Sequence, residues 1–173
     1  MSDTPFDVLA IGNAIVDILV HADDNFLDHQ GLTKGTMGLI DANASKALYK
    51  QVQSVTECSG GSAANTIAGI AALGGRGAFI GKVRDDYFGD VFSHDINASG
   101  VYFKTPKLET GPATATCIVI VTPDAERTMQ TYLGASIELG PRDIIANEVA
   151  AAKVTFLEGY LWDPPAAREA FVK

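Results

Sequence analysis

Cysteine and histidine are scarce in this sequence of 173 residues, which contains two cysteines and three histidines. Two cysteines are too few for the disulfide framework of a small secreted domain. Cys58 and Cys117 also have no histidine beside them, so neither shows the spacing of a zinc ligand or the neighbour of a nucleophilic thiol. We therefore expect no metal site within this chain.

Positive charge is also in short supply. The sequence has 13 Lys and Arg against 21 Asp and Glu, a net charge of -8 and a pI of about 4.7. This balance disfavours a nucleic-acid backbone or an anionic membrane surface as a partner. No stretch reaches the ~18 apolar residues of a membrane span, and residues 1–7 lack the basic and apolar regions of a secretory signal. The sequence predicts a soluble, cytoplasmic protein.

Apolar residues are plentiful enough for one core of ordinary size, because 47% of the sequence is hydrophobic and 20% is charged. Strand and helix patterns alternate, which is typical of an α/β fold with a mainly parallel sheet. Core strands are expected at 6–12, 78–83 and 154–159, and helices at 62–73, 87–99 and from 165 onward.

Two β-rich stretches interrupt this alternation. Residues 113–121 alternate small and β-branched side chains, a Pro-Asp turn follows, and residues 127–133 form the return strand. We expect an antiparallel hairpin here. A shorter strand is expected near 37–40, and residues 15–20 are expected to join the same sheet.

A glycine pair precedes a helix of small residues, in the run Gly60-Gly61-Ser62-Ala63-Ala64-Asn65. Glycine lets the backbone approach a ligand closely, and a helix start offers free N–H groups. The amide of Asn65 both donates and accepts hydrogen bonds, as sugar hydroxyls require. The run therefore indicates a site for a polyhydroxyl ligand. The alternative is a glycine-rich helix start without a ligand, because short glycine motifs also occur by chance.

Asn13 and Asp17 follow the first core strand, which ends at Gly12. Ligands of open α/β sheets bind outside the carboxyl ends of the strands, so Asp17 is expected near the binding crevice. Its carboxylate can accept hydrogen bonds from two vicinal hydroxyls of a ribose-like ring. The alternative is a turn or capping aspartate.

Four ordered segments carry a resemblance to a known family: Gly12–Asp17, Gly60–Asn65, Gly81–Gly89 and Pro123–Thr128. Each is short, but their order and spacing resemble the ribokinase and adenosine kinase family of sugar and nucleoside kinases, often called the PfkB family. The resemblance covers nearly the whole chain but only the first half of the family pattern.

The resemblance implies a ribokinase-like fold, in which a partial three-layer α/β/α sheet carries a small β-sheet lid over the substrate. Residues 1–173 would then form the N-terminal part of a kinase domain. Lid segments are expected at about 15–40 and 103–134, inserted in an α/β core of 1–14, 41–102 and 135–173.

The activity that the resemblance implies is transfer of the γ-phosphate of ATP, with Mg²⁺, to a primary hydroxyl of a nucleoside or sugar. Thr114–Cys117 and Tyr132–Ala135 are more similar to the adenosine kinase branch, which favours an adenosine-like substrate. One alternative is a carbohydrate kinase of the ribokinase or fructokinase type. Another is a sugar- or nucleoside-binding module without catalysis.

Site residues follow from the same resemblance. Glu158, at the end of the third core strand, is expected to touch the sugar or to face solvent. The residues expected to bind the sugar hydroxyls are Asn13, Asp17, Gly60, Gly61, Ser62 and Asn65.

The hairpin contributes further candidates. Arg127 is expected to contact the transferring phosphate; the alternative is an exposed arginine paired with Glu126 or Asp124. Four residues are expected to form an apolar slot for a purine base: Met37, Leu39, Leu133 and Ala135. The alternative is that they only pack within the lid.

The family's Gly-Ala-Gly-Asp motif, whose aspartate is the catalytic base, does not occur in this sequence, and neither does its Asn-x-x-Glu pattern. Most of the ATP site also belongs to the second half of the family pattern. We therefore expect this chain to bind substrate but to be inactive as a kinase alone. A homodimer through the lid strands is a further expectation from the family.

Overall fold

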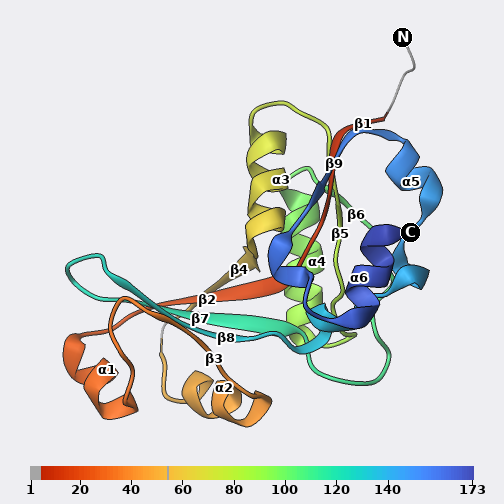
Figure 1. Cartoon of the computed structure of the whole chain (residues 1–173). Helices are drawn as coiled ribbons and strands as arrows, with labels where there is room; N and C mark the ends of the chain where they lie inside the picture. The colour runs from red at the N-terminus through yellow and green to blue at the C-terminus, as the bar shows by residue number, and fades with distance from the viewer. Residues whose placement is uncertain (1–4, 54) are drawn as a thin grey trace.

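The structure is a computed structural model that describes residues 5–53 and 55–173. Two β-sheets meet at an angle and give the molecule the outline of an L (Figure 1). One arm is a parallel sheet between helices, and the other is a second sheet with helices on one side. This arrangement confirms the α/β fold with a separate lid sheet.

The core sheet has four parallel strands in the order β6-β5-β1-β9. Successive residues of a strand point to opposite faces, so β1 supplies apolar side chains to both. Val8 and Ala10 pack on one side, and Leu9 and Ile11 on the other. The strands are β1 (Phe6–Ile11), β5 (Gly77–Ile80), β6 (Tyr102–Phe103) and β9 (Ala152–Leu157).

Helices cover both faces of this sheet and complete the three layers (Figure 1). One face carries α3 (Ser62–Ala72) and α4 (Tyr87–Ala98), in which Phe92 and Ile96 share the buried side. The other face carries α5 (Ala146–Ala150), α6 (Pro165–Val172) and the 3₁₀ segments η1 (Gly134–Glu138), η2 (Pro141–Asp143) and η3 (Gly159–Leu161).

The lid sheet has five strands in the order β3-β8-β7-β2-β4. The predicted hairpin is confirmed as the antiparallel pair β7–β8, whereas β2 pairs parallel with β7 and β3 pairs parallel with β8. One face is covered by α1 (Asp24–Gln30) and α2 (Ala42–Tyr49). The strands are β2 (Ile15–His21), β3 (Met37–Leu39), β4 (Thr56–Gly60), β7 (Ala115–Val121) and β8 (Arg127–Tyr132).

The lid is larger than the sequence indicated, and the expected boundary at residue 41 is wrong. Residues 41–60 supply α2 and β4, and β4 pairs antiparallel with β2. The Oγ of Ser45 in α2 also lies 3.0 Å from the Oγ1 of Thr116 on β7. Strand β6, in turn, belongs to the core sheet. Strand β4 was not predicted because its sequence is mostly polar, with Thr56 as its one β-branched residue.

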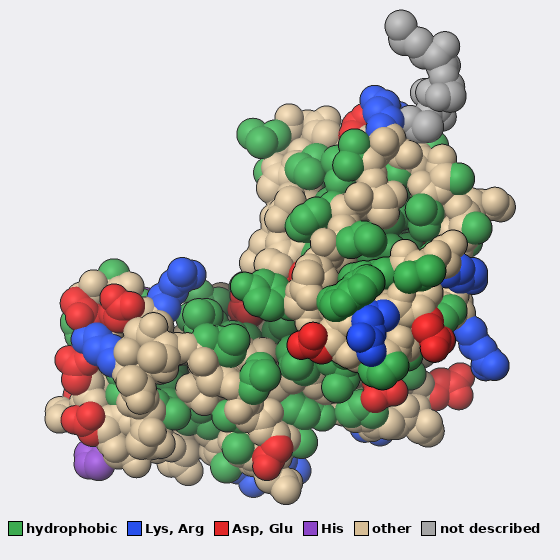
Figure 2. Space-filling model, in the orientation of Figure 1, with side chains coloured by type: hydrophobic (Ala, Val, Ile, Leu, Met, Phe, Trp, Pro, Cys, Tyr) green, Lys and Arg blue, Asp and Glu red, His purple; other side chains and the backbone are tan. Residues whose placement is uncertain are grey.

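Hydrophobic side chains stay exposed along β9 and the segment after it. Within the described residues β9 pairs only with β1, so it forms one edge of the core sheet. Val154, Trp162 and Val172 are 56%, 48% and 80% exposed. Figure 2 shows hydrophobic side chains gathered on the face that carries β9 and α6. No helix in the described ranges has the length and apolar character needed to cross a membrane.

Candidate functional site

A cavity of about 480 Å³ lies where the lid sheet meets the carboxyl ends of β1 and β9. Open α/β sheets bind ligands at this end of their strands. The cavity is lined by Asn13, Ile15, Asp17, Met37, Leu39, Gly61, Ser62, Asn65, Cys117, Arg127, Met129, Thr131, Leu133, Glu158, Gly159, Tyr160 and Asp163. Segments from both ends of the chain therefore build one site.

Asp17 projects into this cavity from β2. The strand register places it directly opposite Cys58 on β4 and Cys117 on β7. Burial raises the pKa of the Asp17 carboxyl to about 6, and the positive charge of Arg127 acts in the opposite direction. Among the described residues, no donor forms a hydrogen bond with this carboxylate. Asp17 therefore offers an unpartnered acceptor to hydroxyl groups of a ligand.

Two glycines connect the lid to helix α3. A Cβ on Gly60 would lie 2.3 Å from Cγ of Asp17, so the missing side chain makes room for the carboxyl group. Gly61 caps the helix with a φ of 99°, and a Cβ there would lie 2.5 Å from the carbonyl oxygen of Asn13. Only glycine adopts this backbone without strain. Gly60 thus lies behind Asp17, and the cavity itself is lined by Gly61, Ser62 and Asn65.

Glu158 is buried at the base of the cavity, with 3% of its surface exposed. Its carboxylate accepts hydrogen bonds from the backbone N–H and the side-chain amide of Asn13, each at 2.7 Å, from the N–H of Ala63 at 3.1 Å and from the hydroxyl of Ser62. Ser136 donates to Oδ1 of Asn13 at 2.9 Å. The solvent-facing alternative for Glu158 is therefore wrong. Glu158 and Asn13 join β1, β9 and α3 and hold the helix start in place.

Apolar side chains form the lid side of the cavity. Met37 and Leu39 on β3 are 53% and 65% exposed, and Leu133 follows β8 beside them. Ala135 differs from the expectation, because it is fully buried and does not line the cavity. Its N–H bonds the carbonyl of Ala113 at 2.8 Å, where η1 turns the chain back into the core. The slot therefore consists of the long apolar side chains of Met37, Leu39 and Leu133, of which the first two are exposed.

Arg127 is the exposed first residue of β8 and lines the cavity. Met129 and Thr131 line it as well, because alternate residues of a strand share one face. In the part of the chain that the structure describes, Arg127 forms no ion pair, and Asp124 pairs with Lys34 at 2.7 Å instead. The guanidinium group is thus available to an anionic group of a ligand.

Several lining residues were missed by the sequence reasoning. Met129 and Thr131 follow from Arg127 by strand alternation, so that signal was present. Tyr160 and Asp163 lie in and after η3, and Tyr160 is 78% exposed at the cavity. A short 3₁₀ turn has no distinctive sequence pattern, so their placement could not be read from local sequence.

The acidic residues do not gather into a metal site. Within residues 5–53 and 55–173, no group of three or more His, Cys, Asp or Glu side chains is placed to hold a metal ion. The side chains described here therefore do not fit a Mg²⁺ site of their own. Arg127 is the cationic side chain that lines the cavity.

Comparison with known proteins identifies the family. The family described as "pfkB family carbohydrate kinase" matches residues 34–171, which make up most of the chain. The chain belongs to the pfkB family. This result confirms the resemblance carried by the four sequence segments.

Two solved structures of kinases are similar over nearly all of this chain. The adenosine kinase from Sinorhizobium meliloti is 54% identical with a TM-score of 0.88, covering 96% of this chain and 51% of that one. The probable sugar kinase protein from Rhizobium etli CFN 42 is 53% identical with a TM-score of 0.90, covering 98% and 51%. These structures confirm the ribokinase-like fold.

Another relative is named for a different substrate. Probable fructokinase-4 from Arabidopsis thaliana is 35% identical over 97 residues, which cover 55% of this chain and 30% of that protein. The chain spans about half the length of the two solved relatives. The pfkB relatives thus include kinases named for a nucleoside and for a sugar.

Proposed function

We propose that this chain forms the acceptor-binding part of an ATP-dependent kinase that transfers the γ-phosphate to a primary hydroxyl of an adenosine-like nucleoside. The observation that carries the proposal is the carboxylate of Asp17, which has no hydrogen-bond partner among the described residues and lies in a cavity with an apolar wall. A carboxylate suits ribose hydroxyls, and exposed apolar side chains suit the flat faces of a base. The 54% identity to the Sinorhizobium meliloti adenosine kinase supports the same substrate class.

Each site residue has a proposed task. Asp17 accepts hydrogen bonds from two ring hydroxyls, and Asn65 and the backbone at Gly61 hold the same ring. Asn13 and Glu158 position the start of α3. Such orientation of the acceptor hydroxyl lowers the barrier to phosphoryl transfer, because the entropy cost of bringing the reacting atoms together is met when the acceptor binds.

ATP with Mg²⁺ is the phosphoryl donor that membership of the family implies. The described residues hold no metal site, so the tasks proposed for them concern the acceptor. The lid excludes water from the acceptor hydroxyl, and Arg127 contacts the phosphoryl group that the hydroxyl receives. We propose that this chain alone binds the acceptor without phosphorylating it.

A carbohydrate kinase is the second candidate, because a protein named as a fructokinase is 35% identical over 97 residues. A free sugar would use Asp17 and Asn65 but would leave Met37, Leu39 and Leu133 without a partner. Binding of the base moiety therefore distinguishes the two candidates.

Calorimetric titration of the chain with adenosine, ribose and fructose, without ATP, tests the proposal. We expect saturable binding of adenosine and weaker binding of ribose. Tighter binding of fructose than of adenosine would favour the carbohydrate kinase, and no heat from any of the three would overturn the acceptor site. Adding ATP with Mg²⁺ to the adenosine complex should yield no ADP; turnover would contradict the proposed inactivity of this chain.

A further inference from the structure

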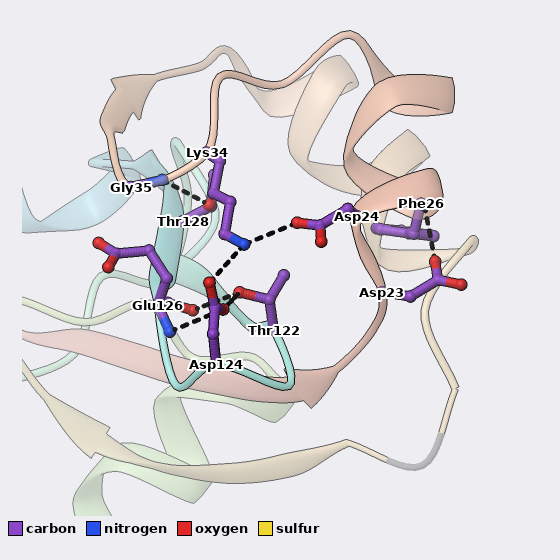
Figure 3. Close-up of polar contacts among 9 residues, drawn as sticks. All are labelled: Asp23, Asp24, Phe26, Lys34, Gly35, Thr122, Asp124, Glu126 and Thr128. Atoms are coloured by element: carbon purple, nitrogen blue, oxygen red, sulfur yellow. Dashed lines mark hydrogen bonds and ion pairs between the residues drawn. The ribbon is translucent and has the colours of Figure 1, made fainter.

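Three segments of the lid meet at the end remote from the core (Figures 1 and 3). They are the start of α1, the link before β3 and the turn between β7 and β8. Lys34 in the link contacts both others: its Nζ lies 2.7 Å from Oδ1 of Asp24 and 2.7 Å from Oδ2 of Asp124. Figure 3 shows the ammonium group between the two carboxylates.

The turn that Lys34 contacts is internally ordered. Asp124 accepts hydrogen bonds from the hydroxyl of Thr122 at 2.6 Å and from the N–H of Glu126 at 3.4 Å. The N–H of Thr122 bonds the carbonyl of Glu126 at 3.0 Å, and Ala125 has a φ of 66°. These bonds connect Asp124 to Glu126, so the contact between Lys34 and Asp124 ties the link to the residue that precedes Arg127.

A second contact holds the other side of Arg127. The N–H of Gly35, next to Lys34, donates to Oγ1 of Thr128 at 3.0 Å (Figure 3). Thr128 is fully buried on the face of β8 that points away from the cavity. Arg127 therefore lies between two residues, Asp124 and Thr128, that are both held by the Lys34–Gly35 link.

Lys34 lies among several carboxylates at this end of the lid. Asp23, Asp24, Asp124 and Glu126 bring four carboxylates to this end of the lid, and Lys34 is the cation that contacts two of them. The contacts raise the pKa of Lys34 and hold the pKa of Asp124 well below its usual range. Without Lys34, like charges on α1 and on the turn would repel each other.

We infer that Lys34 is a positioning residue, which holds the β7–β8 turn so that Arg127 points into the cavity and binds the phosphate of a phosphorylated nucleoside. Lys34 does not line the cavity, and its ammonium group is engaged by two carboxylates, so it acts through Arg127. The inference rests on the proposed nucleoside site and adds the residue that sets the position of the Arg127 guanidinium group.

The test compares adenosine with adenosine 5′-monophosphate, which is the product of the proposed reaction. Both are titrated into the wild-type chain and into Lys34→Met, Lys34→Arg and the control Lys46→Met, which removes an exposed lysine of α2. We expect Lys34→Met to weaken binding of the monophosphate by about fivefold, the upper range for one exposed ion pair, and to leave adenosine binding unchanged. Lys34→Arg should keep the ratio of the two affinities, for adenosine and for the monophosphate, at the wild-type value. Lys46→Met should not change this ratio.

A double variant separates the action through Arg127 from a direct effect of charge. Arg127→Met should weaken monophosphate binding by about tenfold or more, as expected for a lost charge-assisted contact. Adding Lys34→Met to Arg127→Met should cause no further loss, because the positioned group is already absent. An equal further loss in the double variant would overturn the inference in favour of long-range attraction. Asp124→Asn keeps the turn residue and should reproduce the Lys34→Met ratio if the latter variant unfolds.

The outcomes also separate this inference from the proposed function. If adenosine does not bind to the wild-type chain, both fail. If adenosine binds and Lys34→Met leaves the ratio of the two affinities unchanged, the nucleoside site stands and the role of Lys34 is refuted.

Discussion

Asp17 is partly buried beside two cysteines and has no hydrogen-bond partner among the described residues. Burial disfavours the charged carboxylate, and its pKa rises from 3.8 to about 6. The folded chain therefore keeps this proton at pH values where the unfolded chain has lost it. Stability falls as the pH rises between these two values, and the full penalty of about 3 kcal/mol applies above the folded-state pKa.

Asp17→Asn should therefore stabilise the chain more at high pH than at low pH. We expect a gain of up to about 3 kcal/mol near pH 8, falling to about 1 kcal/mol near pH 4.5, from urea unfolding followed by circular dichroism. Asp28→Asn, at an exposed position of α1, serves as the control. A loss of stability in Asp17→Asn at high pH would show that the carboxylate has a stabilising partner.

At the residue scale, the chemical role of a side chain could be predicted from the sequence more readily than its burial. Asp17 and Asn65 line the cavity as expected, because a strand end and a helix start are recognisable locally. Glu158 was harder, since its four donors come from Asn13, Ser62 and Ala63, which are remote in the sequence. Contacts of this separation exist only after the sheet has formed.

At the element scale, two glycines of helix α3 can be compared: Gly61 at its N-cap and Gly69 in its interior. Gly61 needs a φ of 99° and has the Asn13 carbonyl beside it, whereas a Cβ on Gly69, in the helix interior, would have nothing within 4 Å. Gly61→Ala should destabilise the chain by about 2 kcal/mol or more through backbone strain. Gly69→Ala should stabilise it by about 0.5–1 kcal/mol, because alanine favours the helix.

Thermal unfolding of the two variants checks this difference, and titration with adenosine shows whether the helix start matters for binding. Gly69→Ala should leave adenosine affinity unchanged. Equal stability of Gly61→Ala and the wild type would contradict the strained N-cap.

Elements with a clear apolar pattern were predictable. Strands β1, β5 and β9 carry short apolar runs, and β7 and β8 carry β-branched residues around a turn. Strand β4 has neither signal, because its place in the lid is fixed by pairing with β2 rather than by its own side chains. Propensity is weak for such a strand, and the tertiary context decides.

At the scale of the whole molecule, the cavity depends on the angle between two sheets (Figure 1). Asp17 and Arg127 come from the lid, Gly61 connects the lid strand β4 to helix α3, and Glu158 follows the core strand β9. No local pattern brings these residues together. Their combination was expected only because four ordered segments resembled a family, and the match to the pfkB family over residues 34–171 confirms that resemblance.

The most direct test of the account is a calorimetric comparison of adenosine and 2′,3′-dideoxyadenosine on the wild type and on Asp17→Ala. If the Asp17 carboxylate holds the ribose hydroxyls, Asp17→Ala should weaken adenosine binding by about 1–3 kcal/mol and barely change binding of the dideoxy analogue. Equal adenosine affinity in the wild type and in a folded Asp17→Ala chain would contradict the account.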